Sequence, residues 1–172
     1  MISNHRLASA TQSPSINYND RPDGEISLIV IHNISLPPGE FNNPYIEQFF
    51  TNQLDFNAHP YFKTIQDLQV SSHLLIKRDG SIIQFIPFDK RAWHAGQSSF
   101  NGQDNCNDFS IGIELEGTDN LNYEAVQYQS LKTTLKQLKN YYSVQNIVGH
   151  SDIAPGRKTD PGEAFNWGEI KD

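Results

Sequence analysis

The sequence ISLIVIH, residues 26–32, decides the fold. Nearly all of its residues are apolar and most of those are β-branched, which favours an extended chain. An uninterrupted apolar run of this length is typical of a central strand with both faces covered. His32 and Asn33 stand at its end, where α/β sheets commonly place their functional sites.

A second strand is predicted at Ser110–Glu116. Apolar residues alternate there with Gly112, Glu114 and Glu116, so one face is apolar and the other carries two carboxylates. Glu114 can act as a base if it faces a reacting group, whereas Glu116 is expected on a solvated part of the strand. The alternation therefore predicts one face for packing and one for chemistry.

The remaining segments complete an alternating order. In chain order they are a helix at Pro44–Phe50, a hairpin of strands 73–77 and 81–86 around Asp79-Gly80, a helix at Tyr123–Tyr142 and a strand at Gln145–Val148. Residues 51–72 and 151–172 look irregular. The order β-α-β-β-β-α-β predicts a single α/β domain whose mixed central sheet is flanked by helices. Residues 1–25, which are polar, are expected to form an arm packed on a domain spanning 26–172.

The composition is that of an acidic globular chain. Among 172 residues, 37% are hydrophobic, and 13 Lys and Arg against 20 Asp and Glu give a net charge of −7. This balance argues against nucleic acid and anionic membranes as partners, because both need a basic face, and no obligatory protein partner is expected. The start has no apolar stretch of signal-peptide length and Cys106 is the only cysteine, so the expected location is the cytoplasm.

Two of the six histidines, His32 and His150, each follow a short apolar strand. Asp160 comes ten residues after His150, across a turn-forming Ala-Pro-Gly sequence, so its carboxylate can turn back toward the same point. Two imidazoles and one carboxylate form a familiar catalytic zinc shell with an open fourth position. On spacing alone, the alternative has equal weight: two strand-end histidines with backbone partners and a capping aspartate.

Three other side chains have chemistry to offer. Glu114 can take a proton from water beside a metal ion, and Lys158 can stabilise an oxyanion. The alternatives are a solvated strand face and a surface lysine, and composition alone favours the latter for Lys158. Cys106 lies among asparagines and an aspartate, which do not activate a thiol, so a structural role is favoured.

Five longer strings carry more information than the spacing. They are VIHNISLPPGEF (30–41), NAHPYF (57–62), FDKRAWHAG (88–96), CNDFSIGIELEG (106–117) and GHSDIAPGRKTDPG (149–162). In this order they resemble the N-acetylmuramoyl-L-alanine amidases of peptidoglycan recycling, within a wider amidase group that includes the peptidoglycan recognition proteins. The resemblance covers about Asn17–Trp167 and implies a peptidoglycan recognition protein-like amidase fold.

The resemblance also implies a site. One zinc ion per chain would be held by His32, His150 and Asp160, with Glu114 and Lys158 as catalytic residues, and all five match the family pattern. The implied reaction is hydrolysis of the amide bond between muramic acid and the L-alanine of a stem peptide.

The family's substrate is a muropeptide whose sugar is 1,6-anhydro-N-acetylmuramic acid. Residues in matching motifs that are expected to line its pocket are Asn33, Tyr61, Trp93, His94 and Arg157. Trp93 and His94 are equally compatible with a place in the core or behind the metal ligands. Some relatives have arginine where this chain has Gln69 and Asn105, and the candidate substitutes for gripping peptide carboxylates are Lys77, Arg78 and Arg91.

Three other functions stay open. A non-catalytic peptidoglycan-binding module is one, although such relatives typically lack a full zinc set. An amidase acting on intact cell wall is another, which the missing signal region disfavours. A scaffold with a structural metal is the third, but structural zinc normally has four protein ligands and three convincing ones are present.

Overall fold

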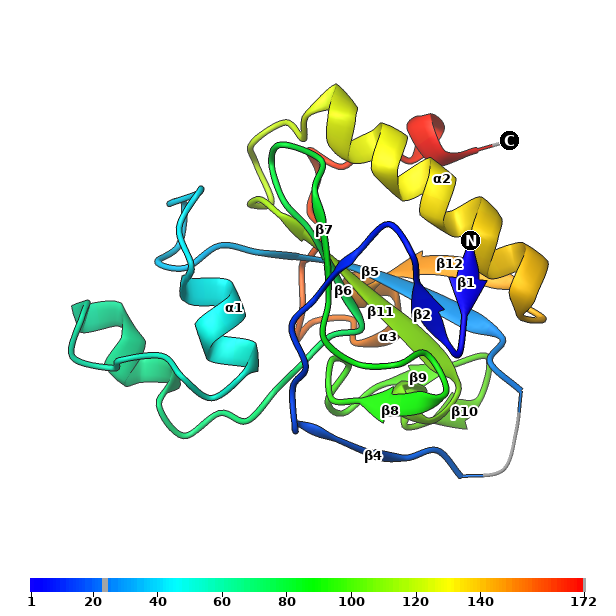
Figure 1. Cartoon of the computed structure of the whole chain (residues 1–172), viewed down its shortest axis with the longest axis horizontal. Helices are drawn as coiled ribbons and strands as arrows, with labels where there is room; N and C mark the ends of the chain where they lie inside the picture. The colour runs from blue at the N-terminus through cyan, green and yellow to red at the C-terminus, as the bar shows by residue number, and fades with distance from the viewer. Residues whose placement is uncertain (23–24, 172) are drawn as a thin grey trace.

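The computed structural model describes residues 1–22 and 25–171. The fold is built around a six-stranded mixed sheet (Figure 1). From edge to edge the strands are β12 (Asn146–Gly149), β5 (Leu28–Ile34), β11 (Ser110–Glu116), β6 (Leu74–Ile76), β7 (Ile82–Gln84) and β3 (Thr11–Gln12). Strands β12, β5, β11 and β6 run parallel, whereas β6 and β7 form the predicted antiparallel hairpin. The predicted central strand, β5, thus has a hydrogen-bonded neighbour on each side.

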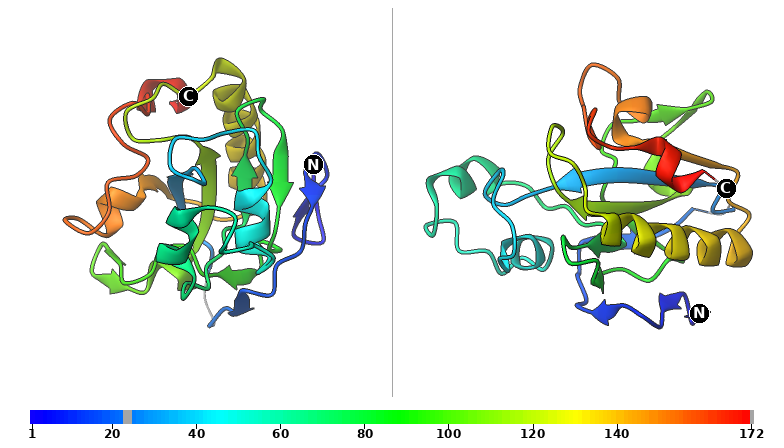
Figure 2. Two further views of the ribbon diagram at one scale, coloured as in Figure 1. Left: turned by 90° about the vertical axis from the view of Figure 1, so that its left-hand side faces the viewer. Right: turned by 90° about the horizontal axis from the view of Figure 1, so that it is seen from above.

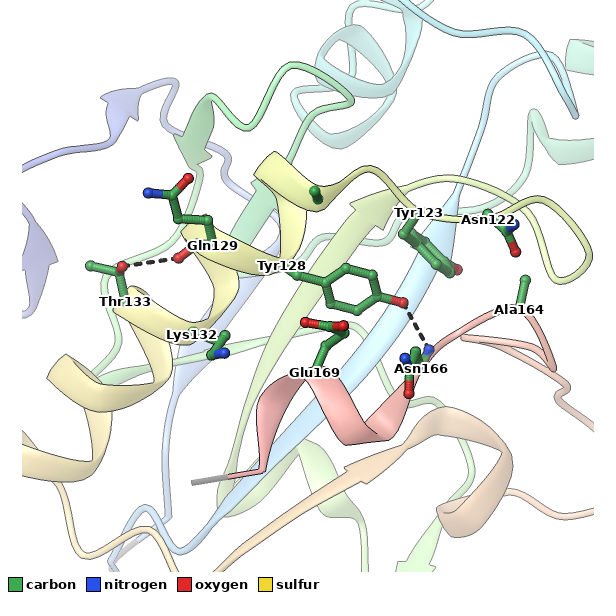
Figure 3. Close-up of a pocket in the computed structure, with 10 residues that line it drawn as sticks. Asn122, Tyr123, Tyr128, Gln129, Lys132, Thr133, Ala164, Asn166 and Glu169 are labelled. Carbon is green, nitrogen blue, oxygen red and sulfur yellow. Dashed lines mark hydrogen bonds between the residues drawn. The ribbon is translucent and has the colours of Figure 1, made fainter.

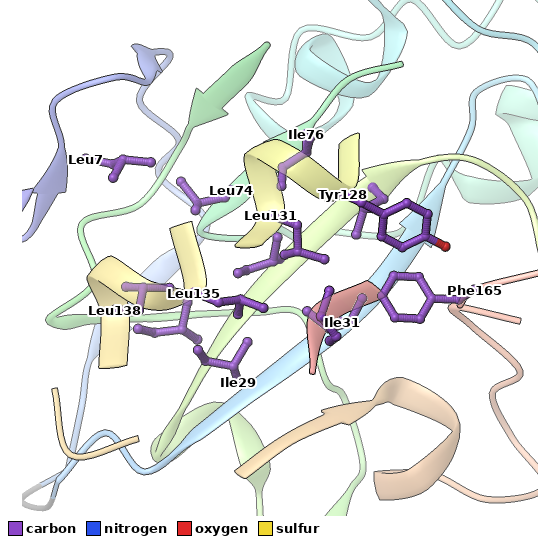
Figure 4. Packing of buried hydrophobic residues seen from close by; sticks show 14 of the residues in the cluster. Leu7, Ile29, Ile31, Leu74, Ile76, Tyr128, Leu131, Leu135, Leu138 and Phe165 are labelled. Carbon is purple, nitrogen blue, oxygen red and sulfur yellow. The ribbon is translucent and has the colours of Figure 1, made fainter. Parts of the chain in front are cut away.

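Helix α2 (Ala125–Tyr141) covers one face of the sheet (Figures 2 and 4). Because side chains alternate along a strand, Ile29 and Ile31 of β5 point to this face, where they share a cluster with Leu131 and Leu138 of the helix. Each fully buried side chain of this size contributes about 1.5–3 kcal/mol relative to an exposed one. The apolar stripe that predicts the helix is therefore the surface that attaches it to the sheet.

The other face of the sheet carries the segments around the site. Leu28 and Val30 of β5 form a separate cluster with Ile153 of the short helix α3 (His150–Ile153). Figure 2 shows α2 and α3 on different sides of the strands. Strand β5 is therefore covered on both faces, as its unbroken apolar run predicts.

Residues 35–72 form an excursion beyond the ends of the strands (Figure 2). Its two helices are α1 (Tyr45–Phe50) and the 3-10 helix η1 (Pro60–Ile65). At the start of η1, His59 Nδ1 accepts a hydrogen bond from the backbone N–H of Tyr61 at 3.2 Å, and proline suits a first helical position because it has no N–H to leave unpaired. The segment expected to be irregular therefore contains a helix that periodicity did not indicate.

The N-terminal arm is attached by strands and by one arginine. β1 (Ile2–Ser3) pairs with β2 (Arg6–Leu7), β3 extends the sheet, and β4 (Tyr18–Asp20) pairs with β8 (Lys90–Ala92). The guanidinium of Arg21 donates hydrogen bonds to four backbone carbonyls, those of Phe88, Asn107, Asp108 and Ser110. Residues 23–24 of the predicted arm lie outside the described residues, and the division at residue 25 stays a prediction.

The predicted order of the main strands and helices is confirmed. Further short elements outside the predicted strands and helices are β9 (Ser99–Phe100), β10 (Gln103–Asp104), η2 (Cys106–Asp108), α3 and η3 (Trp167–Ile170). Within residues 1–22 and 25–171, no helix is both long and apolar enough to cross a membrane.

The expected solvation of Glu116 is wrong. Its side chain is fully buried, and its two carboxylate oxygens accept hydrogen bonds from the backbone N–H groups of Asn42 and Arg78, at 3.0 Å each. Both donors come from loops far away in the sequence, so the alternation within the strand could not reveal them.

Candidate metal centre

Parallel strands deliver three of the candidate residues to one place. His32 lies near the end of β5, and the parallel register pairs it with Glu114 of β11. On the other side of β5, strand β12 ends at Gly149 and His150 follows directly. Because neighbouring strands are about 4.8 Å apart, these side chains start from adjacent backbone positions.

Asp160 reaches the same point on a loop that several residues hold. The backbone N–H of Ser151 donates to the carbonyl of Asp160 at 3.0 Å. The carbonyl of Pro161 accepts from Tyr123 OH at 2.7 Å and from Asn33 Nδ2 at 3.1 Å. The position of the carboxylate is therefore fixed mainly through its backbone.

Asp119 is a second anchor of this loop. Its carboxylate accepts hydrogen bonds from Asn33 Nδ2 at 2.8 Å and from Thr159 Oγ1 at 2.6 Å. Gly162 has φ of +81°, and a Cβ there would lie 2.1 Å from Asp119 Cα, so a side chain does not fit. Sequence reasoning missed Asp119 and Tyr123, and the position of Asp119 in the turn after β11 is the signal that was available.

His32, His150 and Asp160 form a compact group of donor atoms. His32 Nδ1 lies 2.9 Å from His150 Nδ1, and Asp160 Oδ2 lies 3.1 Å from each nitrogen. His150 Nε2 lies 3.0 Å from the carbonyl oxygen of Ala95, which can only accept, so Nε2 carries a proton and Nδ1 is the nitrogen available to a metal ion. Nitrogen and carboxylate donors that face one point fit a divalent metal ion, whose bonds to them are about 2.0–2.2 Å long.

Burial and mutual contact set the charges of this group. Burial lowers the pKa of His32 to about 4, and the hydrogen bond that the carboxylate of Asp160 accepts from the imidazole opposes this shift. Burial raises the pKa of Asp160, but the hydrogen bonds and charges of His150 and His32 outweigh it, so the net pKa is well below its usual range. Near neutral pH, His32 is therefore neutral and Asp160 ionised, the forms that bind metals.

Glu114 lies in the same cleft with one oxygen unpartnered. Its side chain is buried, and Oε2 has no hydrogen-bond partner among the described residues. Burial and the charge of Asp160 raise the pKa of Glu114 well above its usual value, while the ammonium of Lys158 acts in the opposite direction. A buried carboxyl group with a free oxygen and a raised pKa can exchange a proton with a reacting molecule.

The group lies in a cleft of about 680 Å³. All of the predicted site residues line this cleft: His32, Asn33, Tyr61, Trp93, His94, Glu114, His150, Arg157, Lys158 and Asp160. Apolar side chains of the excursion at residues 35–72 also line it, among them Leu36, Phe49, Phe50, Ile65 and Leu68. The cleft therefore combines a polar, titratable part with an apolar part, as pockets for mixed-polarity ligands do.

Arg157 is engaged with the protein as well as lining the cleft. Its Nη2 donates hydrogen bonds to the carbonyls of Ala95 at 2.7 Å and Gln97 at 2.5 Å. The carbonyl of Ala95 is also the partner of His150 Nε2. Arg157 thus holds the backbone group that orients one of the donor imidazoles.

The residues predicted to bind the carboxylates of the peptide lie outside this cleft. They are Lys77, Arg78 and Arg91. Arg78 is paired with Glu124, and Arg91 is paired with Asp108. Their positions do not support the expectation that they replace arginines of other family members.

A second hollow, of about 640 Å³, lies between α2 and η3 (Figure 3). There Tyr128 OH accepts a hydrogen bond from the backbone N–H of Asn166 at 2.8 Å, which ties the C-terminal turn to the helix. Its lining includes Lys132 and Glu169 but none of the predicted site residues. The cleft around His32 is therefore the better candidate for function.

A sequence model for N-acetylmuramoyl-L-alanine amidases matches residues 22–163. The chain therefore belongs to the N-acetylmuramoyl-L-alanine amidase family and is an amide hydrolase. The matched range includes His32, Glu114, His150, Lys158 and Asp160.

Individual members of the family resemble the chain over most of its length. It is 56% identical to the 1,6-anhydro-N-acetylmuramyl-L-alanine amidase AmpD of Citrobacter freundii over 168 residues. The alignment covers 96% of this chain and 90% of that one. A crystal structure of a selenomethionine AmpD derivative superposes with a TM-score of 0.97 at 54% identity, over 99% of this chain and 97% of that one. The N-acetylmuramyl-L-alanine amidase AmiD of E. coli, in complex with the substrate anhydro-N-acetylmuramic acid-L-Ala-D-γ-Glu-L-Lys, superposes with a TM-score of 0.60 at 32% identity, over 84% of this chain and 56% of that one. The predicted peptidoglycan recognition protein-like amidase fold is confirmed.

Proposed function

We propose that this enzyme is a zinc-dependent amidase of peptidoglycan recycling. It would cleave the amide bond between the lactyl carbonyl of (1,6-anhydro-)N-acetylmuramic acid and L-alanine in muropeptides. The observation that supports this most strongly is a single cleft that holds two imidazoles, one carboxylate and a buried glutamate with a free oxygen. The similar AmpD is named for the same reaction, and AmiD binds a substrate of this class.

His32, His150 and Asp160 are the residues proposed to hold one zinc ion per chain. A catalytic zinc keeps a position open, whereas a structural zinc usually has four protein ligands. In the part of the chain that the structure describes, the donor group has three members, which favours the catalytic kind over a structural metal. Zinc bound there supplies Lewis acidity, which polarises a carbonyl and lowers the pKa of water from about 15.7 to about 7.

Glu114 is proposed to move the proton. Its free Oε2 accepts a proton from the water that attacks the lactyl carbonyl carbon. The same oxygen then returns the proton to the alanine nitrogen as the C–N bond breaks and the new C–O bond remains. The products are a carboxylic acid on the sugar and a free amine on the peptide.

Lys158 is proposed to stabilise the negative charge that develops on the carbonyl oxygen. Its charge lowers the pKa of both Glu114 and His32, which is the effect of a nearby ammonium. A fixed cation in a partly desolvated cleft stabilises an oxyanion more than bulk water does. Such local positive charge lets a chain of net charge −7 handle an acidic substrate.

The other cleft residues divide into two proposed roles. Tyr61 and Trp93 are proposed to contact the substrate directly, because both are aromatic residues that line the cleft. Asn33 and Arg157 are proposed to act mainly through the loops that they hold, since Asn33 donates to Asp119 and Arg157 to backbone carbonyls.

Metal analysis combined with a product assay tests the proposal. Purified protein should contain about one zinc ion per chain and should release free peptide from an anhydro-muropeptide. Asp160→Ala should lose zinc under mild chelation, because one of three donors is gone. The control Asp67→Ala removes an exposed carboxylate that does not line the cleft and should keep its zinc. Fully active protein without metal would contradict the proposal.

The same assays separate the rival functions. A non-catalytic module binds muropeptide without releasing peptide, and a cell-wall amidase releases peptide from intact sacculi at least as fast as from soluble muropeptide. We expect turnover of soluble anhydro-muropeptide to be the faster, together with recovery of the native protein in the cytoplasmic fraction. Faster release from sacculi would favour the cell-wall alternative.

A further inference from the structure

Three buried side chains connect the cleft with the interior of the protein. His32 Nε2 lies 2.9 Å from His94 Nδ1, and His94 Nε2 lies 3.1 Å from Ser110 Oγ. Ser110 Oγ donates to the carbonyl oxygen of Cys106 at 2.5 Å. All three side chains are buried, so water competes little for these contacts.

The far end of this series fixes the direction of every hydrogen bond in it. A carbonyl oxygen only accepts, so the Ser110 hydroxyl proton points to Cys106 and the hydroxyl oxygen accepts from His94 Nε2. Because Nε2 of His94 donates to Ser110, Nδ1 is the ring nitrogen that is left to accept in the contact with His32. That nitrogen accepts from His32 Nε2, which leaves a lone pair on His32 Nδ1.

The imidazole of His150 is oriented in the same way by a single hydrogen bond, from its Nε2 to the carbonyl of Ala95. Both imidazoles therefore direct Nδ1 lone pairs at each other, 2.9 Å apart, and at the carboxylate of Asp160. Such an arrangement is repulsive unless a cation lies between the donors: either a proton, which makes the hydrogen bonds to Asp160 described above, or a metal ion. The hydrogen bonds behind the ligands thus prepare the donor set for a cation.

The position of the His94 ring is itself tightly determined. Asn107 Oδ1 accepts a hydrogen bond from the backbone N–H of His94 at 3.1 Å. The ring lies against Gly112 of β11, where a Cβ would come within 2.5 Å of His94 Cγ. Arg21 of the arm holds the carbonyl of Ser110 at 2.7 Å. Both the ring and its hydroxyl partner are therefore anchored by the surrounding backbone.

We propose that His94 is a positioning residue that, together with Ser110, holds His32 in the tautomer with the proton on Nε2 and so raises the zinc affinity of the site. The proposal rests on the zinc-dependent function proposed above. Both ring nitrogens of His94 are used by protein atoms, so neither is free to form a hydrogen bond with the substrate. Hydrogen-bond partners of metal ligands typically contribute about 10–100-fold in metal affinity.

A matched pair of substitutions separates positioning from packing. His94→Asn and His94→Leu introduce side chains of nearly the same shape, but only asparagine can place an acceptor oxygen near the position of Nδ1. We expect His94→Leu to weaken zinc binding by about 10–100-fold and His94→Asn to stay within about fivefold of wild type. Affinity is measured by competition with a chromophoric chelator, on protein whose circular dichroism and melting curve are native-like.

Ser110→Ala tests the hydrogen bond between Ser110 and His94. It also serves as the alternative test if the His94→Leu variant does not fold. Loss of the hydroxyl leaves His94 Nε2–H without its acceptor, so zinc binding should weaken by at least about threefold. Unchanged affinity in this variant would count against the proposal.

The tautomers give a readout that does not depend on activity. Long-range ¹H–¹⁵N correlation spectra of the zinc-loaded wild type should show His32, His94 and His150 with the proton on Nε2. A proton on His94 Nδ1, or equal zinc affinities of His94→Leu and His94→Asn, would overturn the positioning role and leave the zinc amidase function standing. A folded wild-type protein that binds no zinc would overturn both.

Discussion

Glu114 and Glu116 stand two residues apart on the same face of β11, and both are buried, yet their surroundings differ. Glu116 accepts hydrogen bonds from the backbone N–H groups of Asn42 and Arg78, one at each carboxylate oxygen. Glu114 faces the cleft and has an oxygen with no partner in the described chain. The strand gives both residues equivalent backbone positions, so the neighbouring loops decide which carboxylate is structural.

The difference shows how partners separate structure from chemistry in a buried acid. A carboxylate removed from water costs free energy unless N–H donors replace the lost hydrogen bonds. Two backbone donors do so for Glu116, whereas burial of Glu114 is only partly compensated and raises its pKa. A buried acid left in that state within a cleft is a candidate for proton transfer.

The largest effect is expected for Glu114→Gln. Glutamine keeps the shape of the side chain but cannot take up the proton, so release of peptide from an anhydro-muropeptide should fall by up to about 10⁴-fold with zinc still bound. The melting temperature should stay the same or rise, because an unpaired buried acid has been removed. Turnover within about tenfold of wild type would mean that another group moves the proton.

The next largest effect is expected for Lys158→Met. Loss of the ammonium should lower kcat by about 10²–10³-fold if it stabilises the oxyanion. Lys158 also lowers the pKa of Glu114, so its removal raises that pKa, and the acidic limb of the kcat/KM profile should move to higher pH. The control Lys132→Met, in the second hollow, should leave the profile unchanged. An acidic limb that does not move in Lys158→Met would argue against this electrostatic role.

The smallest effect on catalysis is expected for Glu116→Gln. One amide oxygen then serves in place of two carboxylate oxygens, so the backbone N–H group of Asn42 or of Arg78 loses its acceptor. The free energy of unfolding should fall by about 1–3 kcal/mol, a shift of roughly 2–12 °C in Tm for a chain of this size, while kcat stays within about threefold. Strong loss of turnover at wild-type stability would contradict the structural role.

The parts of the fold that sequence patterns predict are those where a regular spacing serves packing. The alternation in Ser110–Glu116 and the apolar stripe of α2 mark the two surfaces that pack together. Helix η1 was missed because its start depends on one local contact, between His59 and Tyr61, which no period reports.

The site is predictable to a similar extent. Strand ends lead to His32, and the two-residue alternation leads to Glu114. The same alternation puts Ser110 on the face of Glu114, but it does not show that the Ser110 hydroxyl lies next to His94. The buried state of Glu116 and the anchoring by Asp119 depend on groups from distant loops, which a single sequence does not bring together.

The parallel register that pairs His32 with Glu114 has a consequence for how the enzyme is formed. A slip of one residue in β11 would turn every side chain of that strand to the opposite face, with isoleucines in the cleft and polar groups against α2. A protein with this shifted register would lose the apolar packing and the geometry of the metal donors together. The shifted register is therefore unstable as well as inactive. The same alternation of apolar and polar residues therefore stabilises the native register and aligns the site residues. Folded molecules with a misaligned site are not expected to accumulate.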